Sequence, residues 1–230
     1  MKKNYLTTLL VGLTFAIGAA QTNRSLSDFN EVKVSTGVRV TLVAGDSHKA
    51  VVEVENCSEE EVMTEVRGSQ LVVKFINQKG LWTNHRNRKA HVTVHYKSLS
   101  GLDVSSGGMI ETQNRIDADH LTLEGASGGQ MELDIMGGSI ETDVASGAVI
   151  TVEGQAQSLK VDVSSGGVFS GYDLSAAVAI ADASSGGVAR ITVTDDLRAG
   201  ASSGGSISYK GNPEKVDLDK SISGSIRSKT

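Results

Sequence analysis

Three acidic residues recur at a fixed spacing in the second half of the chain. Glu124, Asp143 and Asp162 each follow an apolar residue by three positions, and successive members are 19 residues apart. If each 19-residue unit is one coil of a stacked sheet, the three carboxylates lie about 4.8 Å apart in a column. Such a column could bind Ca²⁺ through its oxygens, or raise a carboxylate pKa by repulsion for acid–base catalysis.

The simpler interpretation of this column is a solvated face. Glu141 and Lys160 occupy neighbouring outward positions, and the Gly-rich nonapeptide of calcium-binding rolls is absent. The column is expected to end at Asp162, because Ala181 and Gly200 occupy the next two places in a 19-residue frame. We therefore predict no metal, no cofactor and no catalytic residue.

The segment 81–89 has an unusual composition for an acidic protein. It holds the only Trp of the chain together with three cationic residues and a His. A Trp ring can stack on a sugar or on a partner surface, while Arg side chains pair with carboxylates or sulfates. The alternative is an exposed loop whose Trp packs on the first coil. The candidate residues for binding a glycan or protein are Trp82, His85, Arg86, Arg88 and Lys89.

Several kinds of chemistry lack their sequence signature. No Gly-x-Ser-x-Gly elbow with a His partner follows a strand-to-helix pattern, and there is no phosphate-binding loop, no dinucleotide fingerprint and no Cys/His zinc spacing. The single Cys57 has acidic neighbours, which disfavour a thiolate, so we expect it to be inert. These observations predict a protein that is not an enzyme.

The first twenty residues are typical of an export signal. Lys2 and Lys3 precede an apolar run from Leu6 to Ile17, and Gly18-Ala19-Ala20 is a small-residue cleavage site. The mature chain is expected to begin near Gln21 and to reside in the periplasm, at the outer membrane or on the cell surface. No later run predicts a transmembrane segment. The formal net charge of −5 argues against nucleic-acid binding.

A Ser-Gly-Gly-like motif recurs from residue 106 to residue 225 at intervals of 18 to 21 residues. On each side of the motif, apolar residues alternate with polar ones, which is typical of strands. A strand, a glycine corner, a second strand and a return make one coil of a parallel β-helix. The leading apolar residues, expected to point inward in all seven coils, are Leu102, Leu121, Ile140, Leu159, Val178, Leu197 and Val216.

These patterns divide the chain into four parts. Residues 1–20 are the signal peptide, 21–28 a polar leader, 29–98 a β-rich head or N-terminal cap, and 99–230 an all-β parallel β-helix of about seven coils with a period of 19 to 20 residues. A cap is expected because the first coil would otherwise expose apolar side chains and an unpaired strand edge.

The head and repeats together resemble a known family. The quoted features are Gly37-Val38 with Val40, Leu42 and Gly45, then Glu65-Val66-Arg67-Gly68 before Leu71-Val72-Val73, and then the Ser-Gly-Gly repeats. They are similar to the putative auto-transporter adhesin, head GIN domain family of exported bacterial proteins, over about Phe29 to Ser228. The resemblance implies a right-handed β-helix and an adhesin role, and it carries no catalytic residues.

The sequence thus predicts an exported, non-enzymatic, adhesin-like protein that recognises a glycan or protein partner through its sheet faces and the 81–89 loop. One alternative is a structural component of the cell envelope, in which the edges or ends of the rods form homo-oligomers. A second alternative is a polysaccharide-acting enzyme, because parallel β-helices also host such chemistry. That alternative would need a groove with clustered carboxylates.

Overall fold

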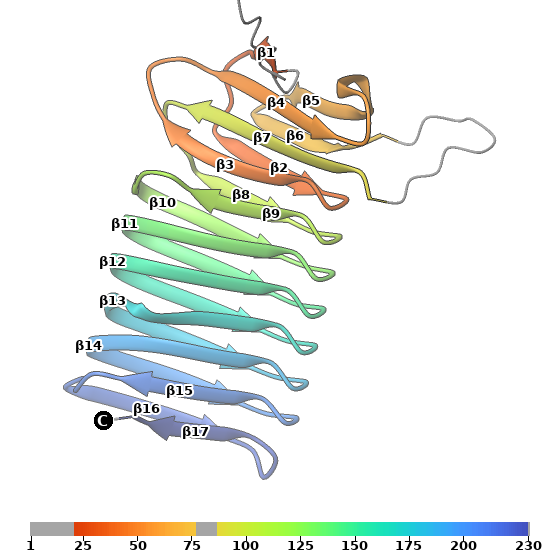
Figure 1. Ribbon diagram of the computed structural model, residues 1–230. Coiled ribbons are helices and arrows are strands. Elements are labelled where there is room, and N and C mark those ends of the chain that lie inside the picture. The colour runs from red at the N-terminus through yellow and green to blue at the C-terminus, as the bar shows by residue number, and fades with distance from the viewer. Residues whose placement is uncertain (1–20, 77–86, 230) are drawn as a thin grey trace, which may run out of the picture.

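The chain winds into a right-handed parallel β-solenoid, a rod of stacked coils (Figure 1). The computed structural model describes residues 21–76 and 87–229. They contain one 3₁₀ helix, η1 (Glu59–Glu61), and seventeen strands: β1 (Gln21–Ser25), β2 (Glu31–Ser35), β3 (Arg39–Ala44), β4 (Lys49–Glu55), β5 (Val62–Arg67), β6 (Gln70–Phe75), β7 (Lys89–Tyr96), β8 (Gly101–Val104), β9 (Met109–Thr112), β10 (Ile116–Gly125), β11 (Gln130–Val144), β12 (Val149–Val163), β13 (Val168–Ala183), β14 (Val188–Ala201), β15 (Ser206–Lys210), β16 (Lys215–Lys220) and β17 (Ser225–Ser228).

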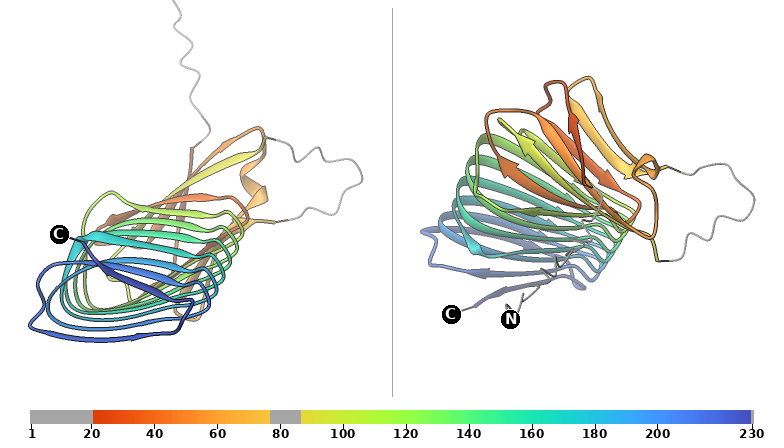
Figure 2. Two further views of the ribbon diagram at one scale, coloured as in Figure 1. Left: turned by 90° about the horizontal axis from the view of Figure 1, so that it is seen from below. Right: turned by 45° about the horizontal axis from the view of Figure 1, so that its top comes forward.

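Two sheets face each other across a narrow apolar interior (Figure 2). The long strands β11 to β14 bend midway, so that each contributes its first half to one sheet and its second half to the other. We call "groove sheet" the one formed by β4, β7, β3, β9, the first halves of β11 to β14, β15 and β17. We call "ladder sheet" the one formed by β6, β2, β8, most of β10, the second halves of β11 to β14, and β16.

The Ser-Gly-Gly motifs form the tight turns between the sheets, as predicted. In the first of them, the Gly108 N–H donates to the Ser105 carbonyl at 2.9 Å, and the two residues between them have φ of 51° and 71°. Positive φ at both central positions defines a type I′ turn, whose twist matches that of the flanking strands. The six equivalent serines from Ser106 to Ser203 all have φ between 48° and 52°. The serine, and not only the glycine, therefore adopts the left-handed conformation.

The last residue of each turn lies against the backbone of the preceding coil. A Cβ on Gly187 would lie 2.4 Å from the Val163 carbonyl oxygen, so only glycine fits there without a shift. The single exception is Ala148, which lies beside Gly125, the residue of the preceding coil that corresponds to Val163. A Cβ added to Gly125 would lie 3.2 Å from the Ala148 Cβ. A missing side chain on one coil thus accompanies the extra methyl on the next.

The predicted inward residues are buried in five of the seven coils; the exceptions are Val178 and, in the last described coil, Val216. Val178 is 38% exposed and Ile180 is 39% exposed, whereas Ala179 and Ala181 are buried. The expectation that Val178 points inward was therefore wrong. The cause is an extra residue in β13, which pairs Thr151 with Ser170 but Glu153 with Asp173.

A one-residue slip in a strand moves every side chain to the opposite face. With Val178 and Ile180 inward, Asp182 would also point into the apolar interior. Burying an unpaired carboxylate costs more than exposing two aliphatic side chains. The observed register therefore keeps Asp182 outside and fills the interior with alanines beside the fully buried Phe169.

The parallel stack extends into the N-terminal part of the chain. β2 pairs with β8, and β3 pairs with β9, so that Val32 lies beside Leu102 and Val40 beside Ile110. On the other side, β6 and β7 pair in parallel with β2 and β3. The antiparallel strands β1, β4 and β5 then cover this end of the rod (Figure 2).

We predict that Gly187→Ala lowers the free energy of unfolding by about 3 kcal/mol, because the new methyl group overlaps the Val163 carbonyl. The matched control is Gly186→Ala, at φ 75° with no atom within 4 Å of the added Cβ. It should cost about 1 kcal/mol through backbone strain alone. Urea denaturation of both variants measures the difference, and equal losses would contradict the proposed contact.

Candidate functional site

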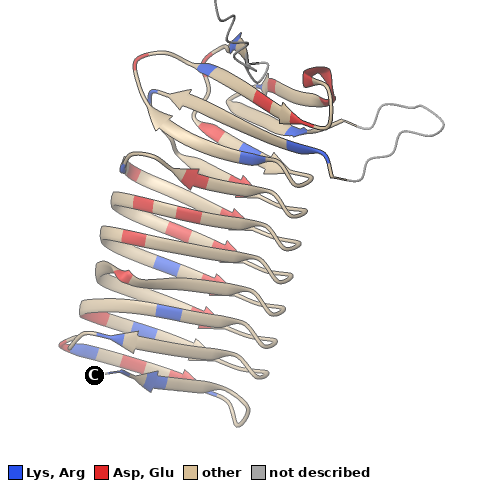
Figure 3. Cartoon of the chain, viewed as in Figure 1, with Lys and Arg blue, Asp and Glu red and all other residues tan. Residues whose placement is uncertain are grey.

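Five carboxylates form one column on the outer face of the ladder sheet. The registers place the predicted Glu124, Asp143 and Asp162 side by side, and add Asp103 before them and Asp182 after them. We call these five residues the acidic column. Figure 3 shows acidic residues recurring near the turn-side ends of the successive strands. The expectation that the column ends at Asp162 was wrong, because Ala181 lies inside the coil.

The missed members follow from counting back from the turns. In every coil the column residue lies five positions before the last turn residue, as Asp103 precedes Gly108 and Asp182 precedes Gly187. Counting forward from the leading apolar residue does not locate Asp103, because Leu102 pairs with Leu123 and not with Leu121. Gly200 interrupts the column after Asp182, and Asp219 follows in the last coil.

The ends of the acidic column differ in their electrostatics. At the head end, the Lys33 ammonium forms an ion pair with Asp103. At the other end, burial raises the pKa of Asp182 above that of an ordinary aspartate, and repulsion from Asp162 and Asp219 adds to the shift. The Asp182 carboxylate also leans over Gly200, whose added Cβ would lie 2.3 Å from Oδ1.

Cations lie beside the column rather than within it. The Lys160 ammonium pairs with Glu141 in the adjacent column, and this hydrogen bond raises the Lys160 pKa. Two coils further on, the Arg198 Nε lies 3.2 Å from the Asp217 carboxylate. The ladder sheet therefore presents a row of carboxylates next to a row of mixed charge.

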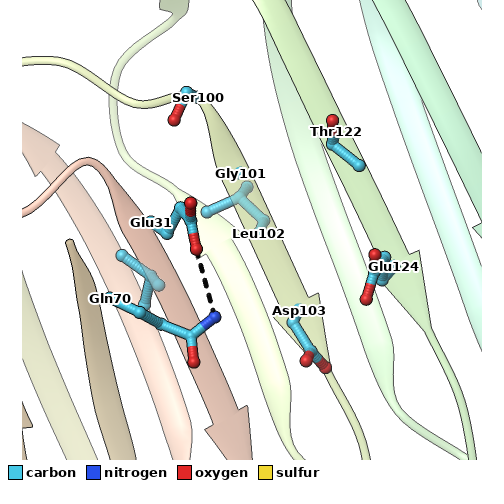
Figure 4. Close-up of a pocket in the computed structure, with 9 residues that line it drawn as sticks. Glu31, Gln70, Ser100, Gly101, Leu102, Asp103, Thr122 and Glu124 are labelled. Atoms are coloured by element: carbon cyan, nitrogen blue, oxygen red, sulfur yellow. Dashed lines mark hydrogen bonds between the residues drawn. The ribbon is translucent and has the colours of Figure 1, made fainter. Parts of the chain in front are cut away.

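A pocket of about 210 Å³ opens at the head end of the acidic column (Figure 4). Gly101 lets the Glu31 side chain lie close to the backbone of β8, because a Cβ on Gly101 would lie 3.2 Å from the Glu31 Cγ. The Gln70 side-chain amide donates to the Glu31 carboxylate at 3.3 Å. Asp103 and Glu124 of the column line the same pocket, so its walls are rich in hydrogen-bond acceptors.

The groove sheet carries a second carboxylate cluster that the sequence did not reveal. A groove of about 570 Å³ runs over β9 and β11 to β13. The Arg115 Nε donates to Asp134 at 2.8 Å, which raises the Arg115 pKa, and the Thr41 hydroxyl donates to Glu111 at 2.7 Å. The extra residue of β13 lies at this point of the sheet. The carboxylates lining the groove are Glu111, Glu132, Asp134, Glu153 and Asp173.

The predicted binding loop lies only partly within the described residues. Trp82, His85 and Arg86 lie outside them. The Arg88 guanidinium lies over the Phe75 ring, 4.1 Å from its centre, and 3.5 Å from the Glu61 carboxylate, with 16% of its side chain exposed. The Lys89 ammonium forms an exposed ion pair with Glu55 at 2.9 Å. Arg88 is thus held in the structure at the base of the loop, whereas Lys89 faces solvent.

Within residues 21–76 and 87–229, no cluster of three or more His, Cys, Asp or Glu side chains is arranged to hold a metal ion. No helix in the described part of the chain is long and apolar enough to cross a membrane.

The pKa of the Cys57 thiol is raised above its ordinary value. Burial is the main cause, and repulsion from the Glu61 carboxylate adds to it.

Stacked coils with charged columns on their outer faces define a β-solenoid of the kind that offers long, flat surfaces. The chain belongs to the family described as putative auto-transporter adhesin, head GIN domain, whose model matches residues 28–213. No curated protein matches it in sequence.

Solved structures share this fold. A putative adhesin from Bacteroides fragilis has a TM-score of 0.80 at 19% identity, covering 91% of this chain and 96% of its own. A putative adhesin from Parabacteroides merdae has a TM-score of 0.72 at 18% identity, and the match covers 92% of this chain and 96% of its own. A putative lipid binding protein from Parabacteroides distasonis has a TM-score of 0.66 at 18% identity, and the match again covers 92% of this chain and 96% of its own. At these identities the similarity establishes the fold alone.

We predict that Arg88→Ala lowers the free energy of unfolding by about 1–2 kcal/mol, because it removes a partly buried cation–π contact and an ion pair. The control, Lys89→Ala, removes an exposed pair and should cost about 0.5 kcal/mol or less. Thermal unfolding of both variants provides the comparison. An unchanged midpoint for Arg88→Ala would contradict this structural role.

A second prediction concerns Asp182, whose raised pKa makes its ionised form unfavourable in the folded state. The stability that the protonated form provides is present at acidic pH. It is lost as the pH rises from the unfolded pKa, about 3.9, through the higher folded pKa. Asp182→Asn should therefore unfold at a higher temperature than the parent at neutral pH and at the same temperature at acidic pH. Asp119→Asn, outside the column, should leave this pH dependence unchanged, and an equal change in both variants would refute the assignment.

Proposed function

We propose that the protein is an exported, adhesin-like binding protein that holds a glycan or protein partner against the outer face of the ladder sheet. The observation that carries the proposal is the acidic column, five carboxylates on adjacent parallel strands. Strands of a rigid sheet are about 4.8 Å apart, so the column is a regular row of acceptors. The hydroxyl groups of a glycan or the cationic side chains of a protein segment are the donors that such a row fits.

Two further features support this function. The family to which the chain belongs is described as an adhesin family. The pocket at the head end of the column gives a bound chain a place to insert a group. The 81–89 loop is a second contact with the partner, and Trp82 is its stacking residue.

The groove sheet supports one other candidate, an enzyme that acts on a polysaccharide. Glycoside hydrolysis uses two carboxyl groups on either side of the scissile bond, and the groove brings carboxylates such as Glu132 and Glu153 onto neighbouring strands. Release of reducing ends from a polysaccharide, abolished by Glu132→Gln with Glu153→Gln, would favour this candidate over binding alone.

Binding of the mature chain, residues 21–230, to arrays of glycans and extracellular-matrix proteins tests the proposal. We expect a selective ligand whose affinity falls at least tenfold in the double variant Asp143→Asn/Asp162→Asn, since two neighbouring acceptors of the row lose their charge. The matched control is Asp119→Asn/Asp195→Asn, which removes the same charge outside the column and should bind as the parent does. Trp82→Ala tests the loop separately.

Each variant is first shown to be folded by its circular dichroism. No ligand above background for the parent would overturn the binding function. Equal losses in the column variant and its control would overturn the assignment to the acidic column.

A further inference from the structure

In the last described coil, one edge of the ladder sheet has no partner strand among the described residues. The registers of the described strands give β16 a single partner, β14, and β17 a single partner, β15 (Figure 1). Val216 and Leu218 continue the inward columns of the buried Leu197 and Ala199, yet they are 46% and 44% exposed because no described coil follows. An open strand edge with apolar side chains is a template for another strand.

The order of charges along this edge is self-complementary. If β16 pairs antiparallel with β16 of a second copy so that Asp217 faces its own counterpart, Lys215 faces Asp219 on the outer face. On the inner face the same register sets Val216 against Leu218 of the second copy. One step further out, Glu214 faces Lys220. Opposite charges and apolar pairs at directly opposed positions stabilise an antiparallel ladder.

Neighbouring registers are less favourable. A shift of the centre to Leu218 sets Asp217 against Asp219 twice, with like charges opposed. A shift to Val216 sets Leu218 against Glu214 and brings Pro213, which lacks an N–H, into the ladder. In the register centred on Asp217 the one like-charge contact is Asp217 with itself, and the Arg198 of each copy lies 3.2 Å from that carboxylate.

We propose that this edge is a homodimer interface, in which β16 of two copies pairs antiparallel about a two-fold axis at Asp217 and the ladder sheet continues from one rod into the other. An isologous contact of this kind closes after two copies. The inward position of Lys220 disfavours pairing with an unrelated apolar strand, because a charge would then face the interior without a partner. In the dimer it faces Glu214.

The oligomeric state of the mature chain, measured by analytical ultracentrifugation over a range of concentrations, tests the proposal. We expect a dimer for the parent. Lys215→Asp opposes carboxylates in the dimer, and Asp219→Lys opposes ammonium groups, so each variant should self-associate at least tenfold more weakly. The double variant Lys215→Asp/Asp219→Lys restores opposite pairs and should dimerise again.

Mixing the two single variants provides an independent readout, since only their heterodimer has opposite charges at both positions. We expect dimers in the mixture at concentrations at which each variant alone is a monomer. Asp217→Cys should form an intermolecular disulfide at the two-fold axis, whereas Asp119→Cys should not. A parent that is monomeric at every concentration would overturn the interface. So would single variants that dimerise as strongly as the parent.

Discussion

The structure depends on one constraint, which is that each coil must place apolar side chains inward at the same two or three positions while every second residue faces water. Strand alternation links the two faces, so a change of register cannot move one residue alone. The β13 coil shows how this constraint is resolved. Val178 and Ile180 are exposed to solvent and alanines fill the interior, because the alternative register would bury Asp182.

The same constraint produces the acidic column. Each column residue lies between two inward positions of its strand, as Asp143 lies between the buried Thr142 and Val144. The turn that follows is held against the preceding coil by its last residue, Gly or Ala. The distance from turn to column residue is therefore constant, even where the coil gains or loses residues elsewhere. A surface with repeated charges is thus a direct consequence of how the interior is aligned.

The sequence predicted what repeats and missed what interrupts the repeat. The period, the strands and the glycine corners follow from local patterns, so the fold class was predicted correctly. The register of β13 could not be predicted from the pattern alone. Alanines alternate there with Val178, Ile180 and Asp182, so either face could point inward, and only the cost of burying the Asp182 carboxylate decides between them. The groove on the other sheet was missed because Glu132 and Glu153 come from separate coils, near an added residue that shifts the pairing.

The two proposed surfaces meet at the last coil, and the dimer register has a consequence for the acidic face. In that register Asp219, which lies in line with the acidic column, faces Lys215 of the second copy. Lys215 and Asp219 are four residues apart in a strand, so the columns of the two rods run away from the interface in opposite directions, along lines offset by about 13 Å. Each line of carboxylates then begins at Lys33 and ends at a lysine of the other copy. A dimer of this kind would present two bounded acidic rows on one continuous sheet, which suits a partner that carries two cationic or hydroxyl-rich segments.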